Sequence, residues 1–140
     1  MQRRFKWAIT LCLMTMMLTM KTDVYASELQ MPEMVKMRAT AYCVNGTTAS
    51  GKKTRIGIAA SSKNYIGLTA LVYQRLPGDL VGDLIGIYEI EDTGGTDGLQ
   101  NGNVIDCWYP DLDACQEFMN RVYEDGCQGK VYVQLVEAKG

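Results

Sequence analysis

Six short segments with alternating or largely apolar side chains most constrain the fold of this chain. Polar turns rich in glycine separate them, as at 45–53 and 93–102. Such segments are typical of strands, which we expect at residues 34–42, 55–60, 68–73, 84–90, 104–108 and 130–136. Six short strands with little helix predict a mainly β fold, either a small barrel or a sandwich.

One helix is expected, near the C-terminus. Pro110, Asp111 and Asp113 would open it, because acidic side chains are favoured at the positive end of the helix dipole. A buried face follows from apolar residues at helical spacing, namely Leu112, Cys115, Phe118, Met119 and Val122. Gly126 would end the helical region.

The first 26 residues have the pattern of a secretory signal peptide. Arg3, Arg4 and Lys6 precede an uncharged apolar run over 7–20, and the segment Val24-Tyr25-Ala26 offers a cleavage site. The run is short for a membrane span, which needs about 20 residues, so an uncleaved anchor is the weaker alternative. We therefore expect a signal peptide over 1–26, a short lead over 27–36 and one domain over 37–140.

Histidine is missing from the sequence, which excludes Ser-His-Asp and Cys-His mechanisms and the common zinc sites that contain histidine. We expect no metal and no cofactor. The net charge of −2 gives no sign of a nucleic-acid partner. Beyond the signal peptide, four cysteines predict up to two disulfides, with three possible pairings. The preferred pairing is Cys43 with Cys107 and Cys115 with Cys127, because the second loop is short.

Two aspartates, Asp92 and Asp106, lie 14 residues apart in distinctive contexts. Asp106 interrupts an apolar run, and burial there would raise its pKa and favour proton donation near neutral pH. Alternation along that strand places Asp106 on the opposite face from its immediate neighbours. Asp92 precedes a Thr-Gly-Gly turn, where its carboxylate can accept backbone N–H bonds. Either aspartate could instead have only a structural role.

Several short motifs occur in the order found in one family of bacterial cell-wall domains. They lie at residues 38–42, 48–51, 58–60, 91–95 and 102–106, and the helix follows them. In this order they resemble the 3D (three-aspartate) domain, which is similar to the catalytic barrel of lytic transglycosylase A and to stationary-phase-survival muralytic proteins. The resemblance covers residues 37–136, nearly all of the expected domain.

The resemblance implies a small double-psi β-barrel that acts on the glycan strands of peptidoglycan, outside the cytoplasm and in association with the cell wall. It implies cleavage of the bond between N-acetylmuramic acid and N-acetylglucosamine, with Asp106 as the single acid and base and Asp92 close by. The product would carry a 1,6-anhydro ring. Candidate substrate-binding residues are Thr40, Tyr42, Thr93, Gly94, Gly95 and Trp108. The Trp108 ring could equally fill the core.

One position departs from the family. Ser61 stands where the family has its first aspartate. This change favours a second hypothesis, a barrel of the same type that binds peptidoglycan or another polysaccharide without cutting it. A third is a dimeric aspartic protease, because residues 92–94 copy that family's Asp-Thr-Gly motif. Glu91 counts against it, since an apolar residue is expected before that motif.

Overall fold

The structure is a computed structural model that describes residues 33–138. The expected signal peptide over 1–26 lies outside the described residues, as does most of the lead over 27–36. Within the described part of the chain, no helix is long and apolar enough to cross a membrane.

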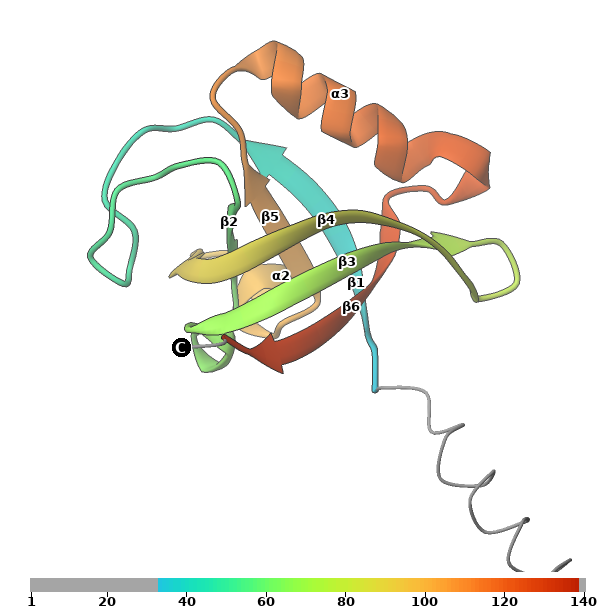
Figure 1. Cartoon of the computed structure of the whole chain (residues 1–140), viewed down its shortest axis with the longest axis horizontal. Helices are drawn as coiled ribbons and strands as arrows, with labels where there is room; N and C mark the ends of the chain where they lie inside the picture. Colours follow the sequence, from blue (N-terminus) through green and yellow to red (C-terminus); the bar gives the residue numbers. More distant parts are fainter. Residues whose placement is uncertain (1–32, 139–140) are drawn as a thin grey trace, which may run out of the picture. The chain divides into compact units, whose positions relative to one another are not determined.

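Six strands close into a barrel in the order β1-β5-β2-β4-β3-β6 (Figure 1). Their bounds are β1 Val35–Tyr42, β2 Ile58–Ser61, β3 Leu68–Leu76, β4 Leu80–Thr93, β5 Val104–Trp108 and β6 Lys130–Glu137. The β1–β5 and β2–β4 pairs are parallel, and the other four pairs are antiparallel. The mainly β class and the small barrel with one principal helix are therefore confirmed.

The barrel interior is filled by the inward-facing residues of each strand. On β5, Ile105 and Cys107 are fully buried, whereas Asp106 between them is not. On β1, Met37 and Ala39 face the same core, and the alternate residues lie outside. Strand alternation thus separates an apolar interior from a polar outer face, as expected for the sequence around Asp106.

The principal helix, α3 (Leu112–Tyr123), packs chiefly on β1 and covers one side of the barrel (Figure 1). Asp111 caps it, because its Oδ1 accepts a 2.8 Å hydrogen bond from the Ala114 N–H. Phe118 and Val122 insert into the barrel core. The described residues also form three short helical segments: η1 Lys63–Tyr65, α2 Asp97–Gln100 and η2 Glu124–Gly126.

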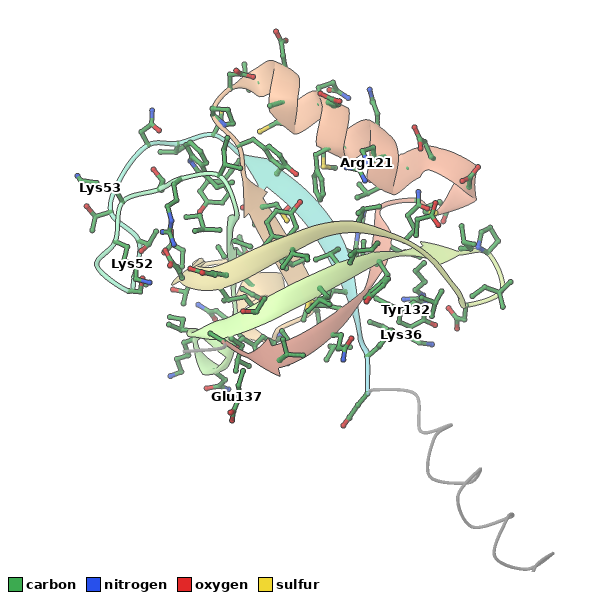
Figure 2. The ribbon with its side chains drawn as sticks, viewed as in Figure 1. Lys36, Lys52, Lys53, Arg121, Tyr132 and Glu137 are labelled. Carbon is green, nitrogen blue, oxygen red and sulfur yellow. The ribbon has the colours of Figure 1, made fainter. Side chains whose placement is uncertain are left out.

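The β3–β4 hairpin is longer than the sequence suggested. Strand β4 begins at Leu80, not at residue 84, because Gly78 and Asp79 both take positive φ and turn the chain directly back. The Asp79 carboxylate accepts hydrogen bonds from Lys36 Nζ at 2.8 Å and from Arg75 Nε at 2.7 Å. Figure 2 shows Lys36 beside Tyr132 at this turn. These contacts secure the hairpin against β1 and β6.

The four described cysteines are thiols, and the preferred pairing does not fit the fold. Cys115 lies in the first turn of α3, whereas Cys127 follows the far end of that helix. At 1.5 Å per residue, the helix alone separates Cys115 from Tyr123 by about 12 Å. A disulfide needs Cα atoms within about 7 Å. Cys127 stays at the far end of the helix, where its N–H donates to the Glu124 carbonyl and the Gly129 N–H donates to the Val122 carbonyl. The fold therefore does not support a bond between Cys115 and Cys127.

Candidate functional site

Four residues on neighbouring strands form one row across the barrel wall. Thr40 on β1 pairs with Asp106 on β5, Asp106 pairs with Ala60 on β2, and Ala60 pairs with Asp92 on β4. Adjacent strands lie about 4.8 Å apart, so one intervening strand puts about 10 Å between the backbones of the two aspartates. Barrel closure thus brings Asp92 and Asp106 into one neighbourhood, with Thr40 at the end of the row.

Asp106 is a half-buried carboxyl group with one hydrogen-bond donor beside it. Thr40 Oγ1 donates a 2.7 Å hydrogen bond to Asp106 Oδ1. Burial raises the pKa of Asp106, and the Thr40 hydrogen bond opposes that rise because it favours the charged form. Since Thr40 is exposed, the Asp106 carboxyl lies at the edge of solvent.

Asp92 holds a loop in place, as its position before the turn indicated. Its Oδ1 accepts hydrogen bonds from the Ala49 N–H at 3.0 Å and from the Thr93 N–H at 2.9 Å. Ala49 belongs to the loop over residues 43–57 that joins β1 to β2. Asp92 therefore fixes this loop beside the row, and its carboxylate oxygen is already occupied by backbone donors.

Glu91 secures the same loop from the other side, a role that sequence reasoning missed. Its side chain is only 4% exposed and accepts two hydrogen bonds from the Arg55 guanidinium, at 2.6 and 2.7 Å. Lys52 Nζ adds a third at 2.8 Å. The hydrogen bonds from Arg55 are the main reason that the pKa of Glu91 falls to about 2. The pairing of Glu91 with Arg55 is not recognisable in the sequence, because the two residues are 36 positions apart.

Tyr42 lies at the end of β1, close to both aspartates. Its hydroxyl is buried and has no hydrogen-bond partner among the described residues. Burial raises the pKa of Tyr42, and the nearby charges of Asp92 and Asp106 raise it further. The structure thus places a buried O–H donor that has no partner among the described residues near two carboxylates.

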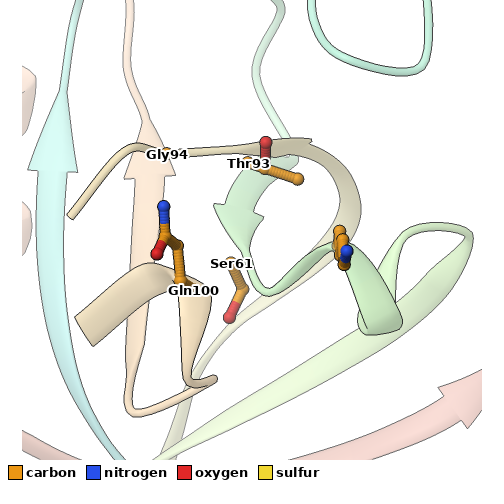
Figure 3. A pocket seen from close by; sticks show the side chains of 5 residues that line it. Ser61, Thr93, Gly94 and Gln100 are labelled. Carbon is orange, nitrogen blue, oxygen red and sulfur yellow. The ribbon is translucent and has the colours of Figure 1, made fainter. Parts of the chain in front are cut away.

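A cavity of about 350 Å³ lies beside the row, at the ends of β2 and β4. It is lined by Ser61, Lys63, Thr93, Gly94 and Gln100. Figure 3 shows Ser61 between Thr93 on β4 and Gln100 on α2. Thr93 and Gly94 were expected at the site and do line this cavity, whereas Gly95 is exposed and outside its lining.

Gly94 has a steric reason to be glycine. A Cβ atom at this position would overlap the Leu99 side chain, which is buried beneath the turn. At Gly95 a Cβ atom would meet nothing within 4 Å. A side chain at the first glycine would therefore have to displace Leu99, whereas a side chain at the second would not meet a neighbour.

Ser61 is part of the wall of the cavity and is itself fully buried. Its Oγ donates a 2.7 Å hydrogen bond to the Val104 carbonyl, which links β2 to the start of β5. An aspartate side chain there would bring its carboxylate against a carbonyl oxygen. The hydrogen bond of Ser61 thus has a structural role that a carboxylate could not take over.

Trp108 is buried, with its indole N–H donating a 3.0 Å hydrogen bond to the Val44 carbonyl. Trp108 lies outside the barrel's core cluster and is on the same face of β5 as Asp106, so it is buried beneath the start of the 43–57 loop. Of the predicted residues, Thr40, Tyr42, Asp92 and Asp106 come together on the outer face, and Thr93 and Gly94 line the adjoining cavity.

Comparisons with family models, with curated proteins and with solved structures give no match to this chain. Among residues 33–138, no group of three or more His, Cys, Asp or Glu side chains is arranged to hold a metal ion. The function must therefore be argued from the geometry of the site itself.

Proposed function

We propose that this protein is a peptidoglycan lytic transglycosylase that acts through Asp106. The observation that carries the proposal is the state of this one carboxyl group: it is half-buried, its pKa is raised by burial, and it adjoins the exposed Thr40 on the outer face of the barrel. A carboxyl group whose pKa is raised by burial and that lies at the edge of solvent is suited to general acid catalysis.

The proposed reaction needs only one such group. Protonated Asp106 gives its proton to the glycosidic oxygen as the bond between N-acetylmuramic acid and N-acetylglucosamine breaks. The resulting carboxylate then takes the proton of the C6 hydroxyl of the same muramic acid, whose oxygen bonds to the anomeric carbon. The products are a chain with a free N-acetylglucosamine end and a 1,6-anhydro-muramic acid end, and Asp106 regains its proton.

The neighbouring residues have supporting roles in this proposal. Asp92 and Glu91 hold the 43–57 loop beside the row. Tyr42 packs close to the two aspartates with its hydroxyl buried, and the cavity lined by Thr93 and Gly94 has room for a sugar substituent. These groups would orient the glycan, while the proton transfer itself is assigned to Asp106 alone.

The decisive experiment is incubation of the protein with purified peptidoglycan, followed by separation and mass analysis of the soluble muropeptides. Products 18 mass units lighter than hydrolysed muropeptides are expected, since no water is added. The Asp106→Asn variant should lose product formation by about 100-fold or more, as expected for removal of a general acid. Asp83→Asn is the matched control, because Asp83 is exposed on β4, away from the row. Hydrolysed products, or unchanged activity in Asp106→Asn, would refute the proposal.

A second candidate is favoured by Ser61. If the first aspartate of the 3D family is needed for turnover, a barrel with serine there would bind peptidoglycan or another polysaccharide without cleaving it. Sedimentation of the protein with insoluble peptidoglycan separates the two hypotheses. Binding that persists in Asp106→Asn, with no soluble product from either protein, supports the non-catalytic module.

A further inference from the structure

We propose that Cys43 and Cys115 form a disulfide by exchange with an external protein or small-molecule disulfide, while Cys107 and Cys127 remain thiols. This inference concerns a modification of the chain and is independent of the proposed enzymatic activity. It replaces the pairing that the short spacing between Cys115 and Cys127 favoured.

The register of β1 places Cys43 towards the interior side of the barrel end. Met37, Ala39 and Ala41 alternate inward along this strand, and Cys43 continues that series one residue beyond its end. The backbone is fixed here, because the Tyr109 N–H donates a 2.9 Å hydrogen bond to the Tyr42 carbonyl. Cys43 is thus held directly beneath the segment that leads from β5 into α3.

Helix α3 brings Cys115 to the same place. Cys115, Phe118 and Val122 form the buried face of the helix, and Cys115 is the member nearest its N-terminus. Because β5 runs parallel to β1 and Trp108 pairs with Tyr42, the chain enters α3 beside the end of the strand that carries Cys43, and α3 packs chiefly on β1. The Cys43 thiol adds to burial in raising the pKa of Cys115, which agrees with this placement.

The other two cysteines lie elsewhere. Cys107 pairs with Ala41 in the parallel β1–β5 register, so Cys43 is two residues further along the neighbouring strand. Two residues along a strand and one strand spacing across give about 8 Å between these Cα atoms, beyond the usual range for a disulfide. Cys107 instead contacts Tyr88 in the core, and Cys127 lies beyond the far end of α3 beside Asp125.

The exchange reaction assigns a role to each thiol. Cys43 is the more exposed of the two, so its thiolate attacks the external disulfide, forms a mixed disulfide and releases one external thiolate. The Cys115 thiolate then attacks the Cys43 sulfur and releases the second. The two cysteine protons pass to the released thiolates, and the external disulfide is reduced by two electrons.

The bond would attach the start of the 43–57 loop to α3. This loop also provides the Ala49 N–H that Asp92 binds. The closed ring would contain β2, β3, β4 and β5, so it would restrict the unfolded chain strongly. Oxidation should therefore raise the melting temperature by more than about 5 °C.

Disulfide mapping tests the proposal. The full chain is oxidised with oxidised glutathione, its remaining thiols are alkylated in denaturant, and it is digested with trypsin and a protease that cleaves before Asp111 and Asp113. That digestion places Cys107 and Cys115 in separate peptides. A peptide linked through Cys43 and Cys115 is expected, with Cys107 and Cys127 alkylated. A bond from Cys43 to Cys107, or alkylation of both Cys43 and Cys115, would overturn the proposal.

Cysteine variants give an independent test of the bond between Cys43 and Cys115. Cys115→Ser should abolish both the linked peptide and the difference in melting temperature between oxidised and reduced protein. Cys127→Ala should keep both. If Cys115→Ser does not fold, the mapping of the unmodified chain still decides the pairing. An equal gain in melting temperature upon oxidation of Cys43→Ser would contradict the assignment.

Discussion

Thr40 and Asp106 face each other across the parallel β1–β5 pair, and the Thr40 hydroxyl donates a 2.7 Å hydrogen bond to the Asp106 carboxylate. This hydrogen bond favours the charged form of Asp106 and works against burial. The protonation state of the proposed acid is thus set by two opposing effects, of which burial is the larger.

Replacing Thr40 with valine should raise the pKa of Asp106 further. The substitution keeps the branched shape and removes the only hydroxyl that opposes the effect of burial on this group. A carbon-13 NMR titration of the Asp106 carboxyl group measures the change directly. Thr69→Val on β3 is the control, and it should leave the Asp106 titration unaltered. A fall in the Asp106 pKa of Thr40→Val would contradict this account.

The Asp106→Asn variant should be more stable than the unmodified protein at pH 7. The folded-state pKa of Asp106 is raised, so the folded protein binds this proton more tightly than the unfolded chain does. Its ionisation therefore lowers stability as the pH rises from about 4 through the folded-state pKa. The free energy of unfolding of Asp106→Asn should therefore exceed that of the unmodified protein at pH 7 and equal it near pH 3. Urea unfolding at both pH values checks this, and an equal gain at both would disprove it.

Glu91→Gln should destabilise the fold by about 2 kcal/mol at neutral pH, because it removes a buried carboxylate that accepts charged hydrogen bonds from Arg55 and Lys52. Glu89→Gln is the matched control. Glu89 is exposed and makes one ion pair with Arg55, so it should cost less than about 1 kcal/mol. Urea denaturation measures both.

The stability lost in Glu91→Gln should also depend on pH. The folded-state pKa of Glu91 is lowered to about 2, so its contribution to stability is present above its unfolded value of about 4.3 and is lost as the pH falls towards 2. The difference in unfolding free energy between the unmodified protein and Glu91→Gln should therefore shrink over that interval. A constant difference from pH 7 to pH 2 would be inconsistent with this ion pair.

Gly94→Ala should cost about 1–3 kcal/mol, since the added methyl group overlaps Leu99 and must displace it. Gly95→Ala, one residue later, should cost less than about 1 kcal/mol because its methyl group meets open space. Thermal unfolding of the two variants in parallel makes the comparison. Equal losses would show that the turn tolerates a side chain equally at both positions.

Local patterns in the sequence were enough to predict much of the barrel. Alternation around Asp106 predicted which side chains of β5 face inward, and acidic residues marked the start of α3. The length of β4 was underestimated, because Gly78 and Asp79 form a turn so tight that the next strand begins at once. Such turns depend on φ values that residue types only suggest.

The relationships between distant segments were harder to predict. The row from Thr40 to Asp92 requires β2 to insert between β4 and β5, which is a consequence of barrel closure. The contact of Glu91 with Arg55 and the proposed bond between Cys43 and Cys115 join residues far apart in the chain, so no local spacing reveals them. The burial of Trp108 likewise follows from the position of the 43–57 loop above it.

Ala60 occupies the row position between the two aspartates, so a whole strand keeps their carboxyl groups apart. The positions that flank Asp106 in the row are Thr40 and Ala60, so no second carboxyl group adjoins it there. Asp106 thus lacks the closely paired partner with which some carboxyl groups share a proton. The rate of any reaction that uses Asp106 should then decline in a single step as the solution becomes more alkaline, without the rising acid limb that a cooperating partner would create.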